Sequence, residues 1–254
     1  MKSRISDKTR FAKGRGKGER EKYIPFLKTR DFSSIGRAHR PKGMLINRTY
    51  ELFSDIEYHF FLLLDFATNI HDIREQFPLD LEETMEIAES HNIVHSPLDS
   101  EEKFVMTTDF LLTMKDGSSI ALSIKPSSEL IKKRVLEKLH VEYSYWKRKS
   151  VTWILLTEKE IDLIILKNIK NFQEKYFHEF ENVDEFIYQL ETHDWDSNTS
   201  IQEILRDVSK KCKIPFGKGR EIFTYLLAHK KIVFDYTKHF SIDNPIHQFK
   251  LNSL

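Results

Sequence analysis

Apolar residues along this chain recur at two different spacings, and these spacings predict helices and strands in alternation. Between residues 49 and 69 they recur every three or four positions, as on one face of a helix. The same spacing predicts a long helix from about Ser127 to Lys149. A shorter helix is expected to begin at Asp80, which can cap its first turn together with Glu83, and to end near His91.

Short runs rich in β-branched and aromatic residues lie between these helices and predict strands. They are residues 73–79, both arms of a hairpin at 107–126, and the run VTWILLT at 151–157. Strands that alternate with long helices, with one hairpin among them, indicate an α/β domain in which helices flank a mixed β-sheet.

The last part of the chain predicts a smaller, separate domain. Helices are expected up to about residue 190, and the polar, turn-rich segment 191–200 is typical of a linker. Beyond it the pattern reads helix, helix, short strands, an order that fits a winged helix. We therefore expect three parts: a basic arm and lead-in at 1–48, an α/β domain at 49–190 and a winged-helix-like domain at 191–254.

The hairpin carries an acid, Asp109, in one strand and a base, Lys125, in the other. A two-residue turn would mix apolar and polar side chains on both faces of the hairpin. A three-residue loop over residues 115–117 instead sets Phe110 opposite Leu122 and makes one face apolar, because opposite residues share a face. The polar face then gathers Thr107, Asp109, Ser123 and Lys125. Segregation of the apolar side chains therefore predicts that Asp109 and Lys125 lie side by side.

Two glutamates are expected to point inward from helices, Glu57 among phenylalanines and Glu142 in the stripe that includes Leu139 and Trp146. A buried carboxylate without a partner costs several kcal/mol. Together with Asp109 and Lys125, the two glutamates suggest a pocket for a hard divalent cation such as Mg²⁺. A buried ion-pair network, or a simple exposed salt bridge between Asp109 and Lys125, would explain the same residues.

Charge is unevenly distributed along the 254 residues. Residues 1–48 hold fifteen Lys/Arg and four Asp/Glu, whereas the rest hold 25 and 35. A basic arm with interleaved aromatic residues (Tyr23, Phe26 and Phe32) on an acidic body favours a polyanionic partner such as nucleic acid, although a solvated tail would have the same composition. The first twenty residues look flexible.

Other features exclude several classes of protein. No apolar run is long enough to cross a bilayer, so no membrane association is expected. The single cysteine, Cys212, excludes an intrachain disulfide and fits a reducing cytosol. The eleven histidines lack zinc-ligand spacing.

The residues singled out so far occur in the order found in one known family. The chain resembles the TnsA family, the endonuclease subunits of heteromeric TnsABC-type transposases, which have a restriction-endonuclease-like fold. The likeness rests on seven ordered segments: GRGKGEREKYIPFL at 14–27, SxGRxHR at 34–40, FSDIE at 53–57, DIREQFPL at 72–79, VMTTDFL at 105–111, IKP at 124–126 and LEKLHVEYSYW at 136–146.

The resemblance implies roles for particular residues. Glu57, Asp109 and Lys125 occupy the family's catalytic positions, with Glu57, Asp109 and Glu142 as ligands of Mg²⁺, for which Mn²⁺ should substitute. Ser123 departs from the family pattern, which has Gln at this position or Glu in relatives, so a metal contact from its side chain is in question.

The implied activity is metal-dependent cleavage of double-stranded DNA at the 5′ ends of a transposon. A TnsB-like partner transposase would act on the 3′ ends. The C-terminal domain is expected to contact a TnsC-like, ATP-dependent regulator. Basic residues at both ends of its second helix (residues 218–231) are consistent with a DNA contact as well, and a solvated face is the alternative. Arg37, His39 and Arg40 are the expected DNA contacts. The resemblance implies a bacterial cytoplasmic protein that joins the nucleoid when active.

Two other functions fit the same residues. One is a stand-alone nuclease of the same fold, such as a junction resolvase or a restriction enzyme. The other is a catalytically lapsed adaptor that binds DNA and protein, and Ser123 is its only support.

Overall fold

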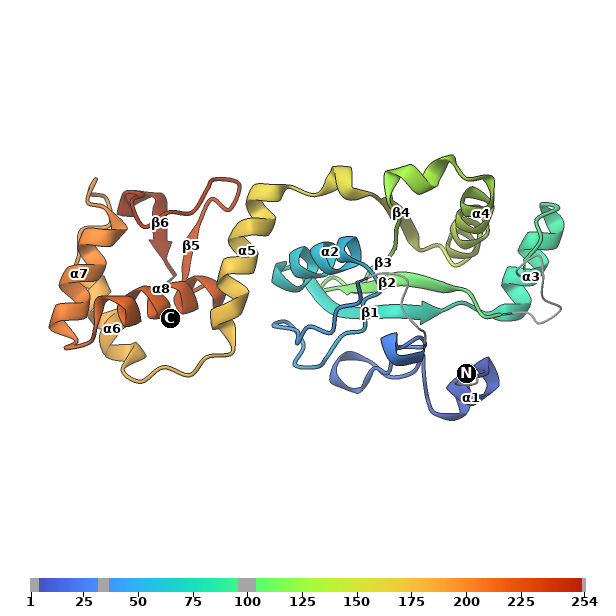
Figure 1. Cartoon of the computed structure of the whole chain (residues 1–254), viewed down its shortest axis with the longest axis horizontal. Coiled ribbons are helices and arrows are strands. Elements are labelled where there is room, and N and C mark those ends of the chain that lie inside the picture. The colour runs from blue at the N-terminus through green and yellow to red at the C-terminus, as the bar shows by residue number, and fades with distance from the viewer. Residues whose placement is uncertain (1–4, 32–36, 96–103, 253–254) are drawn as a thin grey trace. The chain divides into compact units, whose positions relative to one another are not determined.

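The computed structural model describes residues 5–31, 37–95 and 104–252. These residues form two compact units, Met1–Ile161 and Asp162–Leu254. Figure 1 labels the elements of both units along the chain. No helix in the described ranges has the length and apolar character needed to cross a membrane.

The first unit is built around a four-stranded mixed sheet in the order β1-β2-β3-β4. Strands β1, β2 and β3 are antiparallel neighbours, whereas β3 and β4 run parallel. The sheet and its helices confirm the expected α/β class. The elements of this unit are α1 (Asp7–Ala12), η1 (Arg20–Lys22), η2 (Thr29–Asp31), α2 (Asp55–Phe66), β1 (Ile70–Pro78), α3 (Leu81–Ser90), β2 (Thr107–Met114), β3 (Ser119–Ile124), η3 (Ser127–Ile131), α4 (Lys133–Arg148), β4 (Thr152–Leu156) and η4 (Glu158–Glu160).

The hairpin of β2 and β3 has the register that apolar segregation predicts. Phe110 lies opposite Leu122, and Leu112 lies opposite Ile120. The N–H of Met114 donates to the carbonyl of Ser118, so the loop has three residues. Gly117 in this loop has φ +85°, a left-handed conformation that favours glycine.

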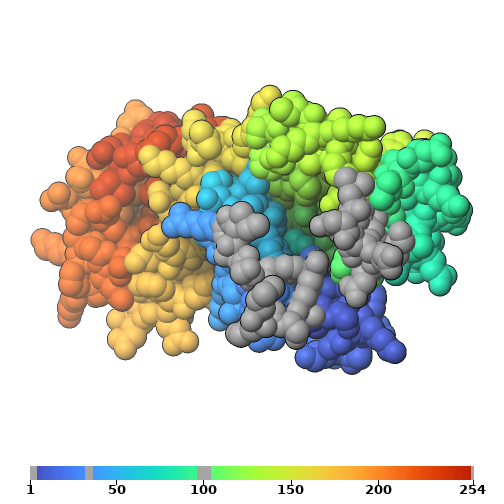
Figure 2. All heavy atoms as spheres, turned by 45° about the vertical axis from the view of Figure 1, so that its right-hand side comes forward, coloured from blue at the N-terminus to red at the C-terminus, as the bar shows by residue number. Residues whose placement is uncertain are grey.

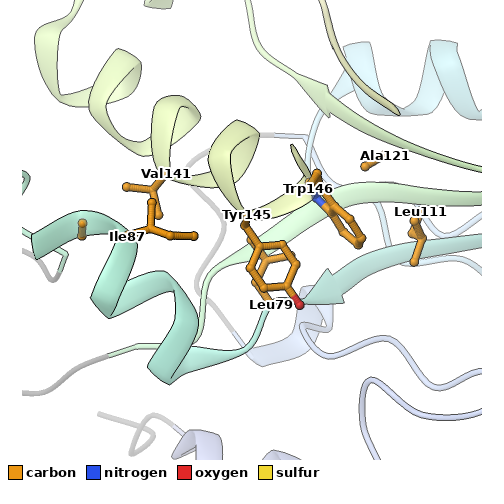
Figure 3. Close-up of a cluster of buried hydrophobic side chains, with 8 residues drawn as sticks. Leu79, Ile87, Leu111, Ala121, Val141, Tyr145 and Trp146 are labelled. Atoms are coloured by element: carbon orange, nitrogen blue, oxygen red, sulfur yellow. The ribbon is translucent and has the colours of Figure 1, made fainter. Parts of the chain in front are cut away.

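Helices α3 and α4 cover one face of the sheet. Leu111 and Ala121 from the sheet pack with Ile87 of α3 and with Val141 and Trp146 of α4 in a buried cluster (Figure 3). Asp80 caps α3 as predicted, because its side chain accepts the N–H of Glu83. Figure 2 shows α4 (green) and α3 (teal) as adjoining parts of the surface of this unit.

The N-terminal segment packs on the sheet at β1. The hydroxyl of Tyr23 donates to the carbonyl of Glu75 at 3.0 Å, and Phe26 is fully buried. Arg15 is also buried and pairs with Asp31. The expected flexibility of the first twenty residues is therefore wrong for residues 5–20, and Tyr23 and Phe26 are core residues rather than exposed docking side chains.

Phe32, the third aromatic residue of the basic arm, lies outside the described residues. The close approach of Pro78 explains why residue 16 is a glycine. A Cβ at Gly16 would lie 2.3 Å from Cγ of Pro78.

Two helix boundaries differ from the prediction. The helix expected at 49–69 begins at Asp55, because Ser54 caps it and residues 49 and 52 form isolated β-bridges with Lys42 and His39. The helix expected from Ser127 is a 3₁₀ turn to Ile131, followed by extended backbone at Lys132 and then α4. Ile131, at the end of this 3₁₀ turn, is 85% exposed.

The second unit begins before the predicted boundary at residue 191. Helix α5 (Leu163–Tyr176) packs against α8 (Phe216–Ala228), and α6 (Val183–Glu191) packs against α7 (Ile201–Lys211). These contacts place α5 and α6 in the C-terminal unit, so segment 191–200 is an internal connection and not a linker between domains.

Short strands complete the second unit. They are β5 (Ile232–Phe234) and β6 (Phe249–Leu251), which pair antiparallel, with η5 (Ile246–Gln248) before β6. The predicted order of helix, helix and strands is confirmed, and the winged-helix assignment stays a prediction.

Arg48 and Glu75 provide a test of how the sheet is stabilised. Arg48 Nη1 donates to Glu75 Oε1 at 2.9 Å, and both side chains are buried. We expect Arg48→Met to lower the free energy of unfolding by about 3–5 kcal/mol, because it strands a buried carboxylate. Urea denaturation at neutral pH measures this loss.

The control is Arg148→Ala, which breaks the exposed pair between Arg148 and Glu86. Exposed pairs contribute about 1 kcal/mol or less. Equal, small losses in both variants would contradict a structural role for the buried pair.

Candidate active site

The centre of the site is the pair that the hairpin register creates. Asp109 on β2 accepts two hydrogen bonds through Oδ2, from the backbone N–H of Ile124 at 2.6 Å and from Lys125 Nζ at 2.8 Å. Lys125 Nζ also donates to the carbonyl of Ile124 at 2.8 Å. Asp109 and Lys125 therefore meet as predicted, with the ammonium held between two oxygens.

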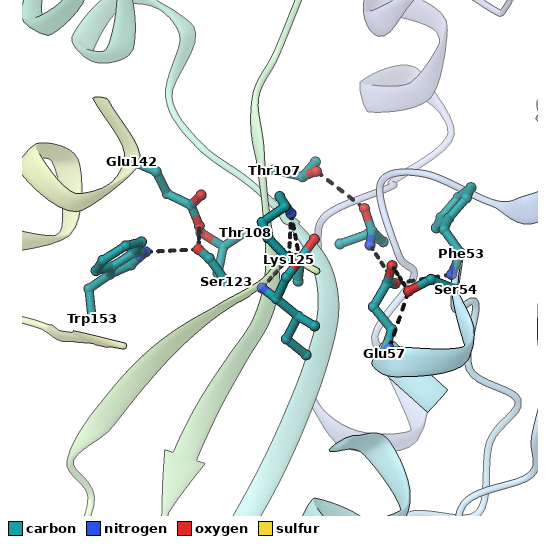
Figure 4. A network of polar contacts seen from close by, with 12 residues as sticks. Phe53, Ser54, Glu57, Thr107, Thr108, Ser123, Lys125, Glu142 and Trp153 are labelled. Atoms are coloured by element: carbon teal, nitrogen blue, oxygen red, sulfur yellow. Dashed lines mark hydrogen bonds and ion pairs between the residues drawn. The ribbon is translucent and has the colours of Figure 1, made fainter. Parts of the chain in front are cut away.

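Glu57 lies on one side of this pair, at the start of α2 (Figure 4). Its carboxylate accepts the N–H of Phe53 at 3.0 Å and the hydroxyl of Ser54 at 2.9 Å. Ser54 in turn caps α2 by accepting the N–H of Glu57. The cap therefore fixes Glu57 in a buried position, as the helical pattern predicted.

Glu142 lies on the other side of Lys125, on α4 (Figure 4). Its Oε1 accepts hydrogen bonds from the hydroxyls of Thr108, at 2.7 Å, and of Ser123. Ser123 also accepts a bond from Trp153 Nε1 at 2.9 Å. Ser123 is therefore part of a buried network that orients Glu142.

The shifted pKa values of Glu57, Glu142 and Lys125 reflect an excess of negative charge in the site. Burial, and secondly the charge of Asp109, raises the pKa of Glu57 to about 7 and that of Glu142 also to about 7. Burial acts to lower the pKa of Lys125, but Asp109, Glu142 and Glu57 outweigh it and raise that pKa. One ammonium thus neutralises only part of the charge of three carboxylates.

The three predicted metal ligands do not form one cluster. The described residues contain no group of three or more His, Cys, Asp or Glu side chains placed to hold a metal. Asp109 Oδ2 and the carbonyl of Ile124 both contact Lys125 Nζ, whereas the carboxylate of Glu142 accepts from Thr108 and Ser123. A ligand role for Glu142 stays a prediction.

Gln76 is a site residue that sequence reasoning missed. Its side chain donates to Glu57 at 3.4 Å and accepts the hydroxyl of Thr107 at 3.2 Å. Gln76, near the end of β1, has φ +49°, an uncommon conformation for a residue other than glycine. No feature of the sequence indicates this irregularity, because it depends on how the end of β1 meets β2.

The three predicted DNA contacts lie around the start of α2. His39 Nε2 lies 2.6 Å from Asp55 Oδ1, and its ring stacks on Tyr58. Arg40 pairs with Glu51 at 3.2 Å while its side chain stays 61% exposed. The hydrogen bond with His39, and further the charges of His39 and Arg37, lower the pKa of Asp55. Part of the SxGRxHR segment, residues 34–36, lies outside the described residues.

In the second unit, helix α8 ends at Ala228, so Lys230 and Lys231 follow the helix rather than lying on it. Lys218 near its start lies over the ring of Phe180 at 4.4 Å. These positions leave a DNA contact by this helix untested.

Comparison with known proteins identifies the family. Residues 67–158 match the family model described as TnsA-like endonuclease N terminal, and residues 160–236 match the model described as TnsA endonuclease C terminal. The chain is also 33% identical, over 235 residues, to the Transposon Tn7 transposition protein TnsA of Escherichia coli, and the match covers 92% of this chain and 78% of that protein. The chain belongs to the TnsA family of transposase endonuclease subunits.

Membership of the TnsA family fits the division seen in the structure. The two matched regions meet at residues 158–160, next to the boundary at Ile161 between the two units. The first matched region contains Asp109, Lys125 and Glu142, whereas Glu57 lies before it. The restriction-endonuclease-like fold expected from the resemblance is therefore supported by both family and architecture.

The raised pKa of Glu57 predicts a specific pH dependence of stability. A carboxyl with a folded pKa of about 7 and an ordinary unfolded pKa binds its proton more tightly when folded, so stability falls as the pH rises from about 5 to 8. We expect Glu57→Gln to reduce this fall by roughly 1–3 kcal/mol. Denaturant unfolding at several pH values measures it.

The matched control is Glu89→Gln at an exposed position of α3, which should leave the pH dependence unchanged. Identical pH profiles for the wild type and Glu57→Gln would show that Glu57 titrates normally.

Proposed function

We propose that this chain cuts DNA at the 5′ ends of a transposon in a reaction that requires Mg²⁺, or Mn²⁺ in its place. A TnsB-like partner transposase would cut and join the 3′ ends. Family membership supports the endonuclease activity, and the proposal for the metal rests on the contacts around Asp109.

The observation that carries the proposal is the position of the Lys125 ammonium. Its Nζ lies 2.8 Å from Asp109 Oδ2 and 2.8 Å from the carbonyl oxygen of Ile124. A carboxylate and a carbonyl are ligands that Mg²⁺ accepts. The ammonium therefore occupies a position where a divalent metal ion would find two suitable oxygen ligands.

The raised pKa values of Glu57 and Glu142 support the same conclusion. Asp109 contributes to both shifts because the carboxylates repel one another. A divalent cation would remove this repulsion. Glu57 and Asp109, with the Ile124 carbonyl, would hold the ion, and Glu142 is a further candidate.

The bound metal would supply an activated water and compensate charge on the scissile phosphate. The chain's own residues have separate tasks. Lys125, when released from Asp109, can turn its ammonium to the phosphate and offset the negative charge that grows in the transition state. Asp109 holds the N–H of Ile124 and so keeps β3 in place beside it. The expected products have 5′-phosphate and 3′-hydroxyl ends.

Contacts with DNA and proteins complete the proposal. Arg37, His39 and Arg40 lie close to the start of α2, near Glu57, where they can bind the phosphate backbone. We assign the contact with a TnsC-like, ATP-dependent regulator to the C-terminal unit. The protein would act on chromosomal DNA in the bacterial cytoplasm.

The two alternative functions have less support. A stand-alone nuclease does not explain why the C-terminal unit matches the TnsA C-terminal model. A lapsed adaptor was suggested by Ser123 alone, and Ser123 bonds to Glu142 without disturbing the pair of Asp109 and Lys125.

Asp109→Asn tests the proposed activity. With the partner transposase and regulator present, we expect 5′-end nicking of transposon-end DNA to fall by about 10³-fold or more, because the variant loses the charge that holds the cation. Labelled 5′ ends report this nicking, and cleavage at the 3′ ends should continue.

The matched control is Asp116→Asn in the loop of the same hairpin, at an exposed position, which should nick as the wild type does. Nicking by Asp109→Asn at the rate of the control would refute the assignment. The wild-type chain alone should cut little, and strong cutting without partners would favour the stand-alone nuclease.

A further inference from the structure

A cavity of about 390 Å³ opens beside the catalytic pair. Its polar lining includes Lys125, Lys138, Glu142 and Thr107, and α4 supplies an apolar wall that includes Val135 and Leu139. None of the roles given above uses Lys138. The cavity therefore adjoins the active site, and its lining includes one cationic side chain, Lys138, that has no role in the proposed reaction.

Lys138 differs from the cations at and just before the start of α4. Lys132 pairs with Glu129 at 2.7 Å, and Arg134 pairs with Glu137 at 3.1 Å. Lys133 lies 3.8 Å from Glu137. Within the described residues, no ion pair includes Lys138.

The acid best placed to pair with Lys138 is committed elsewhere. Glu142 follows Lys138 by four residues, so the two lie on the same face of α4. The carboxylate of Glu142 instead accepts from Thr108 and Ser123. Among the described residues, Lys138 therefore lines the cavity without forming an ion pair, although the carboxylate of Glu142 lines the same cavity.

The electrostatic surroundings agree with this geometry. Burial, and then the charges of Arg134 and Lys125, lowers the pKa of Lys138. Positive groups thus repel Lys138, and an anion in the cavity would relieve the repulsion.

We propose that Lys138 binds a backbone phosphate of the DNA strand next to the phosphate that is cut. The apolar wall formed by Val135 and Leu139 would receive the deoxyribose between the two phosphates, and Lys125 would face the scissile one. Lys138 is thus a positioning residue that holds the strand in register with Asp109. This inference rests on the proposed nuclease function, which it extends by one contact.

Binding of transposon-end DNA tests the contact without cleavage. Binding is measured in EDTA, with the partner transposase, across a series of salt concentrations. Each phosphate neutralised by the protein adds about one unit to the slope of log affinity against log salt. We expect Lys138→Gln to lower the slope by about one unit and Lys138→Arg to restore it.

Lys133→Gln is the matched control, because Lys133 lies on the same helix and its side chain is 92% exposed. It should leave the slope unchanged. Unfolding midpoints for the three variants check that the fold is retained.

A scan with neutral methylphosphonates near the cleavage site then locates the phosphate. At one position the substitution should weaken binding by the wild type but not by Lys138→Gln. A salt slope for Lys138→Gln equal to that of the wild type would overturn the inference. So would a scan in which each methylphosphonate weakens binding by the wild type and by Lys138→Gln equally.

Nicking by the wild type, assayed separately, distinguishes the two proposals. If the wild type nicks DNA but Lys138→Gln has the same salt slope as the wild type, only the role of Lys138 fails. If the wild type does not nick, the proposed function fails while the slope still reports the contact.

Discussion

The pairing of β2 with β3 in one register is the constraint on which the site depends. Side chains alternate along a strand, so a shift of one residue would carry Asp109 away from Lys125. The three-residue loop prevents this shift, and the apolar pairs Phe110–Leu122 and Leu112–Ile120 stabilise the register. The apolar pairs that stabilise this register therefore also bring an acid and a base together. Core packing and the chemistry of the site share one cause.

Charge balance connects the hairpin to the helices around it. Glu57 from α2 and Glu142 from α4 are both buried, and each has a raised pKa because of burial and the nearby Asp109. A buried carboxylate is tolerated only when hydrogen bonds or a cation compensate it. Ser54 and Phe53 provide such bonds for Glu57, and Thr108 and Ser123 provide them for Glu142. The two glutamates are compensated by different elements: Glu57 by residues at the start of α2, and Glu142 by hydroxyls from β2 and β3.

Much of the site could be predicted from the sequence because it follows from local patterns. The hairpin register follows from the alternation of apolar residues, and the inward position of Glu57 follows from helical spacing. Features that depend on contacts between distant segments could not be predicted. Arg15 pairs with Asp31 and is buried, so a segment that the sequence predicts to be flexible is packed. The extended backbone at Lys132 divides a segment whose spacing predicted one helix. The positive φ of Gln76, and the contacts that place α5 and α6 in the second unit, likewise arise from tertiary packing.

The most direct test of a cation site between Glu57 and Asp109 is a crystal structure of the protein grown with Mn²⁺, using anomalous scattering to locate the ion. The account predicts an anomalous peak in contact with the carboxylates of Glu57 and Asp109 and the carbonyl of Ile124, with Lys125 Nζ displaced from Asp109. A structure in which Mn²⁺ is absent from these oxygens at saturating concentration, and Lys125 still bonds to Asp109, would contradict it.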